Sequence, residues 1–309
     1  MIRAGLLLLL LPAMSFAHGD EQHSVWQREM ALLLPLFTAA VWYAVGWVRL
    51  KKRVHSSASP LTRNAVLFGV GWLTIAVSLL SPLHTLGRSS FTAHMTEHEL
   101  LMLAAAPLIA LSRPLALFLW ALPHQVRHAL VNWSNAGAFA RCWRGLSHPL
   151  TATALQAAVL WLWHAPSLFD AALRSEWWHA VQHVSFLASA LLFWWTMTRS
   201  RSQRQRAVAA VYLFVTSVVT GALGALMAIS ASPWYAGYAA LGLQGPLPGG
   251  LSAAEDQQLA GLVMWIPGGL VHFIAALIFA KGALRAWNEA PLTQHTQAAS
   301  SEVLATRTQ

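Results

Sequence analysis

The sequence predicts an all-α protein that crosses a membrane several times. Hydrophobic residues make up 56% of its 309 residues and charged residues only 10%, whereas about 25% of the residues in a typical soluble domain are charged. Its apolar segments approach the roughly 20 residues that a spanning helix needs. The basic residues gather in the short connections between these segments. We therefore expect a polytopic helix bundle and no nucleic-acid partner, despite a formal net charge of +9.

The first segment, residues 1–17, has the pattern of a secretory signal peptide. A short leucine-rich core follows one arginine, and a small-x-small cleavage site ends at Ala17. The apolar run is short for a membrane span, although an uncleaved anchor remains the alternative. Cleavage after Ala17 would leave His18 at the start of an outer, periplasmic segment, residues 18–29.

Seven further apolar stretches predict seven transmembrane helices within a domain of residues 30–285. We place them at about 30–49, 64–82, 95–118, 149–167, 177–198, 208–230 and 257–280. Pro107 and Pro114 should kink or shorten the third, and Pro166 should end or bend the fourth. The connection 119–148 is long enough for a short surface helix.

The distribution of lysine and arginine predicts the orientation of the chain. Sixteen of these residues follow the first, third, fifth and seventh spans, and the other side holds only Arg28, Arg88 and Arg174. Because cytoplasmic loops are enriched in lysine and arginine, the N-terminus is expected outside and the C-terminus inside. The polar tail, residues 286–309, is expected to be disordered in the cytoplasm.

Two histidine pairs are predicted to lie in the same outer layer of the bundle, and the sequence leaves open whether their helices converge. His94 and His98 open the third span, and His179 and His183 open the fifth. Each pair is spaced i, i+4, so its two imidazoles share one helix face. His164 lies at the outer end of the fourth span. Such groups are costly at a membrane without partners, which suggests a metal site, whereas interfacial or hydrogen-bonded histidines are the alternative.

Copper is the metal that best matches these side chains. Imidazole suits copper, zinc, iron and nickel, and thioether sulfur favours Cu(I). Zinc more often has thiolate or carboxylate ligands, and Cys142 is the only cysteine. Met102 and Met264 are weaker candidates, with core packing as the alternative. His18 could add an amine and an imidazole, or simply be a solvated terminus. The sequence leaves the oxidation state open.

Four other polar residues near the spans have less certain roles. His84 falls in an outer loop without a helical partner, so we leave it outside the ligand set. Glu97 lies within the first histidine pair and could be a ligand or a supporting partner. Asp256 is a weaker ligand candidate, and its default role is to cap its own helix. We expect His272, deeper in the seventh span, to make a helix-to-helix hydrogen bond.

Four sequence stretches carry a resemblance to a known family. They are HMTEHELLMLAAAPLIAL (94–111), WLWHAPSLFDAAL (161–173), WWHAVQHVSFL (177–187) and EDQQLAGLVMWIPGGL (255–270). In this order they resemble the CtaG-like polytopic family of bacterial cytochrome c oxidase assembly factors. Together with the order of the spans, the resemblance covers most of residues 30–285. Glu97 departs from the pattern, because an amide is common there.

The resemblance implies a non-enzymatic factor that helps to build a haem–copper oxidase of the respiratory chain. It implies a multi-pass protein of the bacterial inner membrane, with copper handled at the periplasmic face. The expected partners are an oxidase subunit and a soluble copper donor. The motif positions that it indicates are His94, His98, His164, His179, His183 and Asp256.

Two other functions remain open from the sequence. Histidines from different helices can ligate a haem from both sides, as in a membrane electron carrier. A scaffold without a cofactor could instead bind an oxidase subunit through its apolar faces. A metalloprotease is poorly supported, because the glutamate of HMTEH does not occupy its position in His-Glu-x-x-His.

Overall fold

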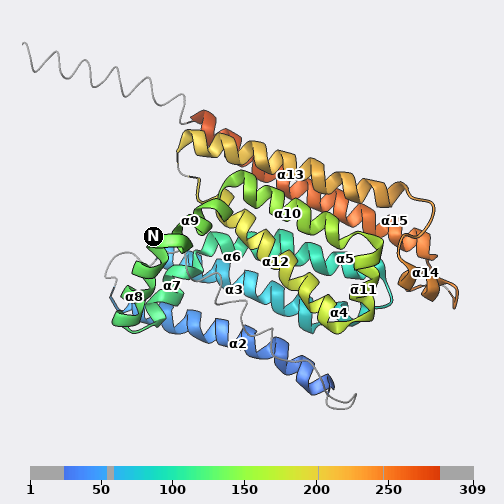
Figure 1. Cartoon of the computed structure of the whole chain (residues 1–309), viewed down its shortest axis with the longest axis horizontal. Helices are drawn as coiled ribbons and strands as arrows, with labels where there is room; N and C mark the ends of the chain where they lie inside the picture. The colour runs from blue at the N-terminus through green and yellow to red at the C-terminus, as the bar shows by residue number, and fades with distance from the viewer. Residues whose placement is uncertain (1–23, 54–58, 201, 246, 286–309) are drawn as a thin grey trace, which may run out of the picture.

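The computed structural model describes residues 24–285 except 54–58, 201 and 246, and its named elements there are all helices (Figure 1). Five helices are long and apolar enough to cross a membrane, or six when one bent pair is counted as a span. An all-α, multi-pass architecture is therefore confirmed, whereas the number of seven spans and the orientation stay predictions. The predicted signal peptide, His18 and the tail from 286 lie outside the described residues.

The long helices lie near the two ends of the described chain, and most of the short ones lie between them. The long ones are α2 (Ser24–Lys51), α3 (Ser59–Leu80), α12 (Glu176–Thr198), α13 (Gln203–Ile229) and the span Ala253–Arg285, which begins with α15 (Ala253–Val263). The short ones are α4 (Pro82–Leu86), α5 (Phe91–Glu99), α6 (Ala106–Ser112), α7 (Pro114–Ala121), α8 (His124–Asn135), α9 (Gly137–Leu146), α10 (Pro149–Trp163), α11 (Pro166–Arg174) and α14 (Ala236–Gly242). Two π-helical turns, η2 (Leu100–Ala105) and η3 (Met264–Gly268), interrupt longer helices. Each predicted span lies mostly in helix, and the fourth corresponds to the 15-residue α10 and the start of α11.

Prolines set the breaks in the third and fourth predicted spans. The third runs through α5, η2 and α6, turns at Arg113 in a left-handed conformation (φ 53°), and restarts at Pro114 with a bend of 57°. Pro107 does not end the helix: η2 directly precedes it, and such a wide turn can accommodate a residue without a backbone N–H. Pro166 starts α11 just after α10 ends at Trp163, as predicted.

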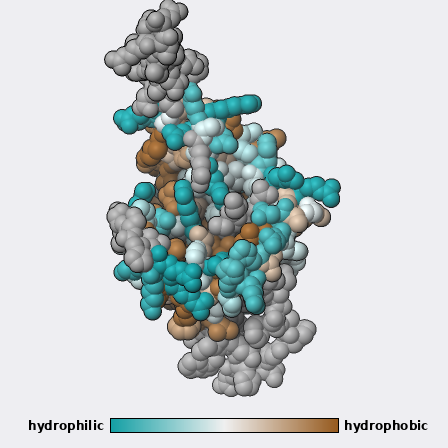
Figure 2. Space-filling model, turned by 90° about the vertical axis from the view of Figure 1, so that its left-hand side faces the viewer, coloured by the Kyte–Doolittle hydropathy of each residue, from teal (hydrophilic) through white to brown (hydrophobic). Residues whose placement is uncertain are grey.

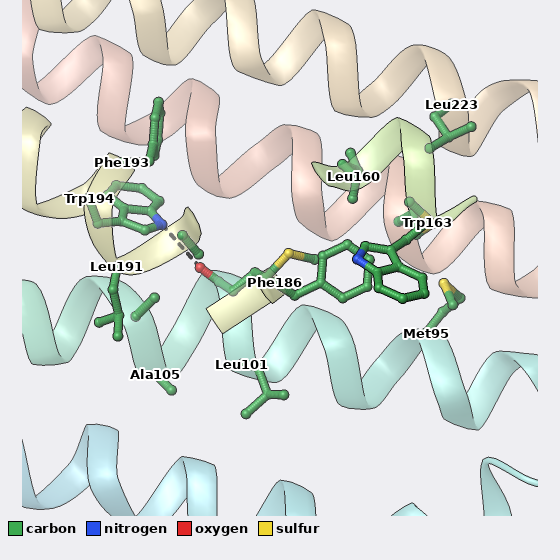
Figure 3. Close-up of a cluster of buried hydrophobic side chains, with 14 of the residues drawn as sticks. Met95, Leu101, Ala105, Leu160, Trp163, Phe186, Leu191, Phe193, Trp194 and Leu223 are labelled. Atoms are coloured by element: carbon green, nitrogen blue, oxygen red, sulfur yellow. Dashed lines mark hydrogen bonds between the residues drawn. The ribbon is translucent and has the colours of Figure 1, made fainter. Parts of the chain in front are cut away.

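The helix α12 lies at the centre of the bundle, between α10 and the α5–α6 segment (Figure 1). The apolar window of α12 is 61% buried, against 17% for that of α2 at the outside. Figure 3 shows Phe186 and Trp194 of α12 within the hydrophobic core. The Trp194 indole donates a hydrogen bond of 3.0 Å to the carbonyl of Met102 in η2. This bond connects the central helix α12 to the π-helical turn η2.

Two glycines allow α13 and α15 to pack in close contact. A Cβ on Gly261 would lie 2.5 Å from the nitrogen of Ala228 and 2.6 Å from the carbonyl oxygen of Gly224. A Cβ on Gly224 would lie 2.8 Å from the carbonyl oxygen of Gly261. Only hydrogen fits at these positions, as in other membrane helix pairs that approach through small residues.

Gly261→Ala should therefore lower the free energy of unfolding by about 1–3 kcal/mol, because the added methyl group forces the two helices apart. Thermal unfolding of the purified protein in detergent measures the effect. Gly69→Ala on α3 is the control, since nothing lies within 4 Å of a Cβ placed there. Equal unfolding temperatures for the two variants would contradict the close contact.

Candidate metal centre

Helices α5 and α12 bring the two histidine pairs face to face at one end of the bundle. Within each pair the ring centroids are 4.4 Å apart. Across the helices, the rings of His98 and His183 are 4.8 Å apart, and those of His94 and His179 are 5.3 Å apart. We call these four residues the histidine cluster. His94, His98 and His183 are buried, and His179 is partly buried.

The Nε2 atoms of the histidine cluster are all buried and have no hydrogen-bond partner among the described residues. Buried polar atoms in proteins nearly always have a partner, so four unpaired imidazole nitrogens in one place are candidate ligand atoms. Three ring nitrogens lie within 4.8 Å of one another, one each from His94, His179 and His183. Two nitrogens bound to one ion at about 2.0 Å can be at most about 4 Å apart. Small ring movements would therefore bring these residues to metal-binding distance.

His84, which we left outside the ligand set, lies against the histidine cluster. The ring centroid of His84 is 5.4 Å from that of His179 and 5.8 Å from that of His183. It is held there by α4, which has Ser81 as N-cap and Pro82 as its first residue. Serine followed by proline is a helix-start pattern. That pattern could have predicted a short helix in place of the expected loop.

Glu97 is fully buried and directs its carboxylate at two histidines. Its Oε1 atom accepts a hydrogen bond of 2.8 Å from Nδ1 of His84 and lies 3.6 Å from Nδ1 of His183. A carboxylate that holds the proton on Nδ1 leaves Nε2 available to a metal, which is a common arrangement around metal-binding histidines. Glu97, His84 and His183 also form a second group of possible ligands. The hydrogen bond to His84 favours the supporting role for Glu97.

His164, in contrast, lies beside the histidine cluster and makes other contacts. Its Nδ1 is 2.7 Å from the carbonyl oxygen of Leu160 in its own helix, and its Nε2 is 3.5 Å from the sulfur of Met95. Phe169 packs against both His164 and His94. Phe186 packs in the same way against both His164 and His98. Each phenyl ring thus contacts the predicted fifth ligand and one histidine of the cluster.

Asp256 joins the last long helix to the one that carries the first histidine pair. Its carboxylate accepts hydrogen bonds from the backbone N–H groups of Phe91 (2.6 Å) and Thr92 (3.2 Å) and from the hydroxyl of Ser90 (3.0 Å). It therefore caps α5, and the expectation that it caps its own helix is wrong. That helix begins with Ser252 as N-cap, in a capping box with Glu255.

The weaker sulfur candidates and His272 lie in the interior. Met102 and Met264 belong to the buried hydrophobic core, which agrees with the packing alternative. Nδ1 of His272 is 2.8 Å from the carbonyl oxygen of Gly268 in the same helix. Its Nε2 has no partner among the described residues, and its contacts with α12 are ring contacts with Trp194 (5.3 Å) and Phe193 (5.8 Å). The expected helix-to-helix hydrogen bond of His272 is therefore wrong.

These features define an integral membrane protein with a histidine–carboxylate centre between its helices. The family model of the cytochrome c oxidase caa3 assembly factor matches residues 41–286. The chain therefore belongs to this family, which confirms the resemblance seen in its motifs.

Curated relatives are similar over part of the chain. Uncharacterized proteins of Mycobacterium bovis and Mycobacterium tuberculosis are each 27% identical over 177 residues, which is 56% of this chain. One of Mycobacterium leprae is 26% identical over 188 residues. The match covers 26% of the length of each relative, so the chain spans about a quarter of them. No solved structure matches the chain.

Asp256→Ala should lower the free energy of unfolding by about 3 kcal/mol, because it leaves buried donors at the start of α5 without an acceptor. Glu255→Ala is the control, since it removes a neighbouring carboxylate that is exposed and should cost much less stability than the loss of Asp256. Chemical denaturation of both variants measures the difference. If the two variants lost the same stability, the cap on α5 would not be important for the fold.

Proposed function

We propose that this chain binds copper at the histidine cluster and supports its insertion into a subunit of a haem–copper oxidase. Membership of an oxidase assembly family supports a role in building the oxidase. The observation that carries the metal assignment is the set of four buried Nε2 atoms without partners. Imidazole is a good copper ligand, and the chain has a single, exposed cysteine that lacks a second thiol to complete a thiolate site.

In this proposal, the residues around the ion have distinct roles. His94, His179 and His183 hold the copper, and His98 is the fourth imidazole within reach. Glu97 orients His183 and His84 through their Nδ1 atoms. Copper is cargo and not a resident cofactor, in either oxidation state. The role of the chain is accordingly assembly and not catalysis.

The setting of this function follows the sequence predictions. The chain is a multi-pass protein of the bacterial inner membrane, inserted by a cleaved signal peptide. Its N-terminus is outside, its C-terminal tail is in the cytoplasm, and the histidine cluster faces the periplasm. A soluble donor delivers copper there, and an oxidase subunit receives it. The basic connections between the spans support this orientation.

The packing around the cluster favours an ion over a haem. A porphyrin needs a flat slot between its two axial histidines. Here His94 and His98 contact the opposite pair, and Phe169 and Phe186 pack against the same rings. A haem would have to separate α5 from α12. A scaffold without any cofactor would not need the unpaired nitrogens, because hydrogen-bonded or apolar residues would cost less in this interior.

Metal analysis of the purified protein after loading with Cu(I) should give about one copper per chain. The double variant His94→Ala, His183→Ala should lose it, because the remaining cluster has too few adjacent nitrogens. The matched control is His124→Ala, His128→Ala. These residues form another i, i+4 pair, with rings 4.3 Å apart on α8, and the control should keep the copper.

Each alternative has its own readout in the same preparation. Full copper binding by the folded cluster variant would contradict the assignment. A Soret band after addition of haem, lost in the cluster variant, would indicate the electron carrier. Co-purification of an oxidase subunit that survives loss of the cluster, with no copper in the wild type, would indicate the scaffold.

Glu97→Gln should weaken copper binding about 10- to 100-fold without abolishing it, because the amide keeps the shape of the side chain but loses the charge that orients the histidines. Competition with a Cu(I) chelator measures the affinity. Glu99→Gln is the control, because the carboxylate of Glu99 packs against Gly268 of the last helix. An unchanged affinity in Glu97→Gln would show that the carboxylate has no part in the site.

A further inference from the structure

The end of the bundle remote from the histidine cluster contains an open pocket of about 560 Å³. It lies where α9, the end of α12 and the start of α13 meet. The lining consists of Trp143, Ser147, Pro149, Trp195, Thr196, Arg199, Ser200, Ser202, Arg204, Gln205 and Val208. Its volume is in the range of ordinary ligand sites. Nothing in the proposed copper chemistry uses this pocket.

The charged residues that line the pocket are all basic. Arg199 and Arg204 both contribute to the lining and are exposed, whereas no acidic residue does. Hydroxyl groups and an amide supply further hydrogen-bonding groups. Figure 2 faces this end of the molecule and shows hydrophilic side chains gathered over it. Arginine presents several donors in a planar fork that fits the oxygens of phosphate, so this lining suits a phosphate-bearing anion.

Two buried tryptophans give the pocket a rigid side. Trp143 comes from α9 and Trp195 from α12, and both belong to the hydrophobic core at this end. The guanidinium carbon of Arg199 lies 4.5 Å from the ring centroid of Trp195. Stacking on an indole restricts the orientation of the guanidinium group. One of the two cations is therefore held in place before any ligand arrives.

An exposed apolar strip leads away from the pocket along α13. Val208 lines the pocket, and Val211, Val215 and Val218 continue on the same helix face at intervals of three and four residues. The side chains of these last three are 60%, 41% and 55% exposed. On the adjoining α10, Leu150 follows the pocket residue Pro149 and is 56% exposed. A ligand that fits both regions has an anionic head and hydrocarbon chains.

We propose that this pocket binds the phosphate headgroup of an anionic phospholipid, with its acyl chains along α10 and α13. The two arginines would contact the phosphate, and the valine strip would contact the chains. A free phosphate would use only the first of these surfaces. Basic pockets between helices at the cytoplasmic side are known to suit anionic headgroups. The expected orientation would place this pocket on that side.

The test uses the full-length protein equilibrated with equal amounts of phosphatidylglycerol and phosphatidylcholine and analysed by native mass spectrometry. We expect preferential retention of phosphatidylglycerol. The double variant Arg199→Gln, Arg204→Gln should bind it about thirtyfold more weakly, on the basis of a typical contribution per arginine at a membrane surface. The matched control is Arg63→Gln, Arg127→Gln, which removes the same charge outside the pocket and should keep the preference.

Three results would overturn the proposal. One is equal retention of both lipids by the wild type, and another is equal loss of the preference in both double variants. The third uses inorganic phosphate without lipid: an arginine-dependent rise in unfolding temperature of the size that phosphatidylglycerol gives would identify a soluble phosphate ligand. Copper content should stay unchanged in the pocket variant, so this test is independent of the histidine cluster.

Discussion

The carboxylate of Asp256 accepts three hydrogen bonds at the start of α5, and the position of the first histidine pair depends on this contact. Burial of an ionised carboxylate is costly unless several donors surround it. Here the donors come from another helix, so the same bonds that satisfy the buried carboxylate also align two helices. Asp170 of α11 is used in the same way, because it accepts from the backbone of Ala236 and Gly237 at the start of α14. Two carboxylates thus connect helices that are distant in sequence, at the end of the bundle that holds the histidine cluster.

Much of this architecture could be predicted from local sequence patterns. The i, i+4 spacing places His94 with His98 and His179 with His183, because helical periodicity is a local property. The positions of Pro114 and Pro166 likewise predicted where helices break. The contact between the two histidine pairs could not be predicted from such local patterns. It depends on how α5 and α12 pack, and no spacing within either helix specifies that.

Where the structure differs from simple local patterns, tertiary contacts or irregular turns are the cause. His84 was left outside the ligand set because it falls in a predicted loop without a helical partner, yet α4 places it against the second pair. Asp256 lies near the start of its own helix, but its carboxylate accepts hydrogen bonds from the start of α5 instead. Met102 follows His98 by four residues, which predicts a shared face in an α-helix. Met102 lies within the π-helical turn η2, where the helix is wider, so that simple count no longer gives the direction of its side chain.

The short helix α10 has a consequence for the surrounding bilayer. Its 15 residues rise about 22 Å, whereas the hydrocarbon layer of a typical membrane is about 30 Å thick. The 27 residues of α13 beside it rise about 40 Å and exceed that thickness. Such a mismatch thins the bilayer or draws polar flanking groups inward, at a cost of fractions of a kcal/mol per Å. With α10 as the predicted fourth span, we therefore expect water and headgroups to approach the middle of the protein more closely beside this helix than along its other faces.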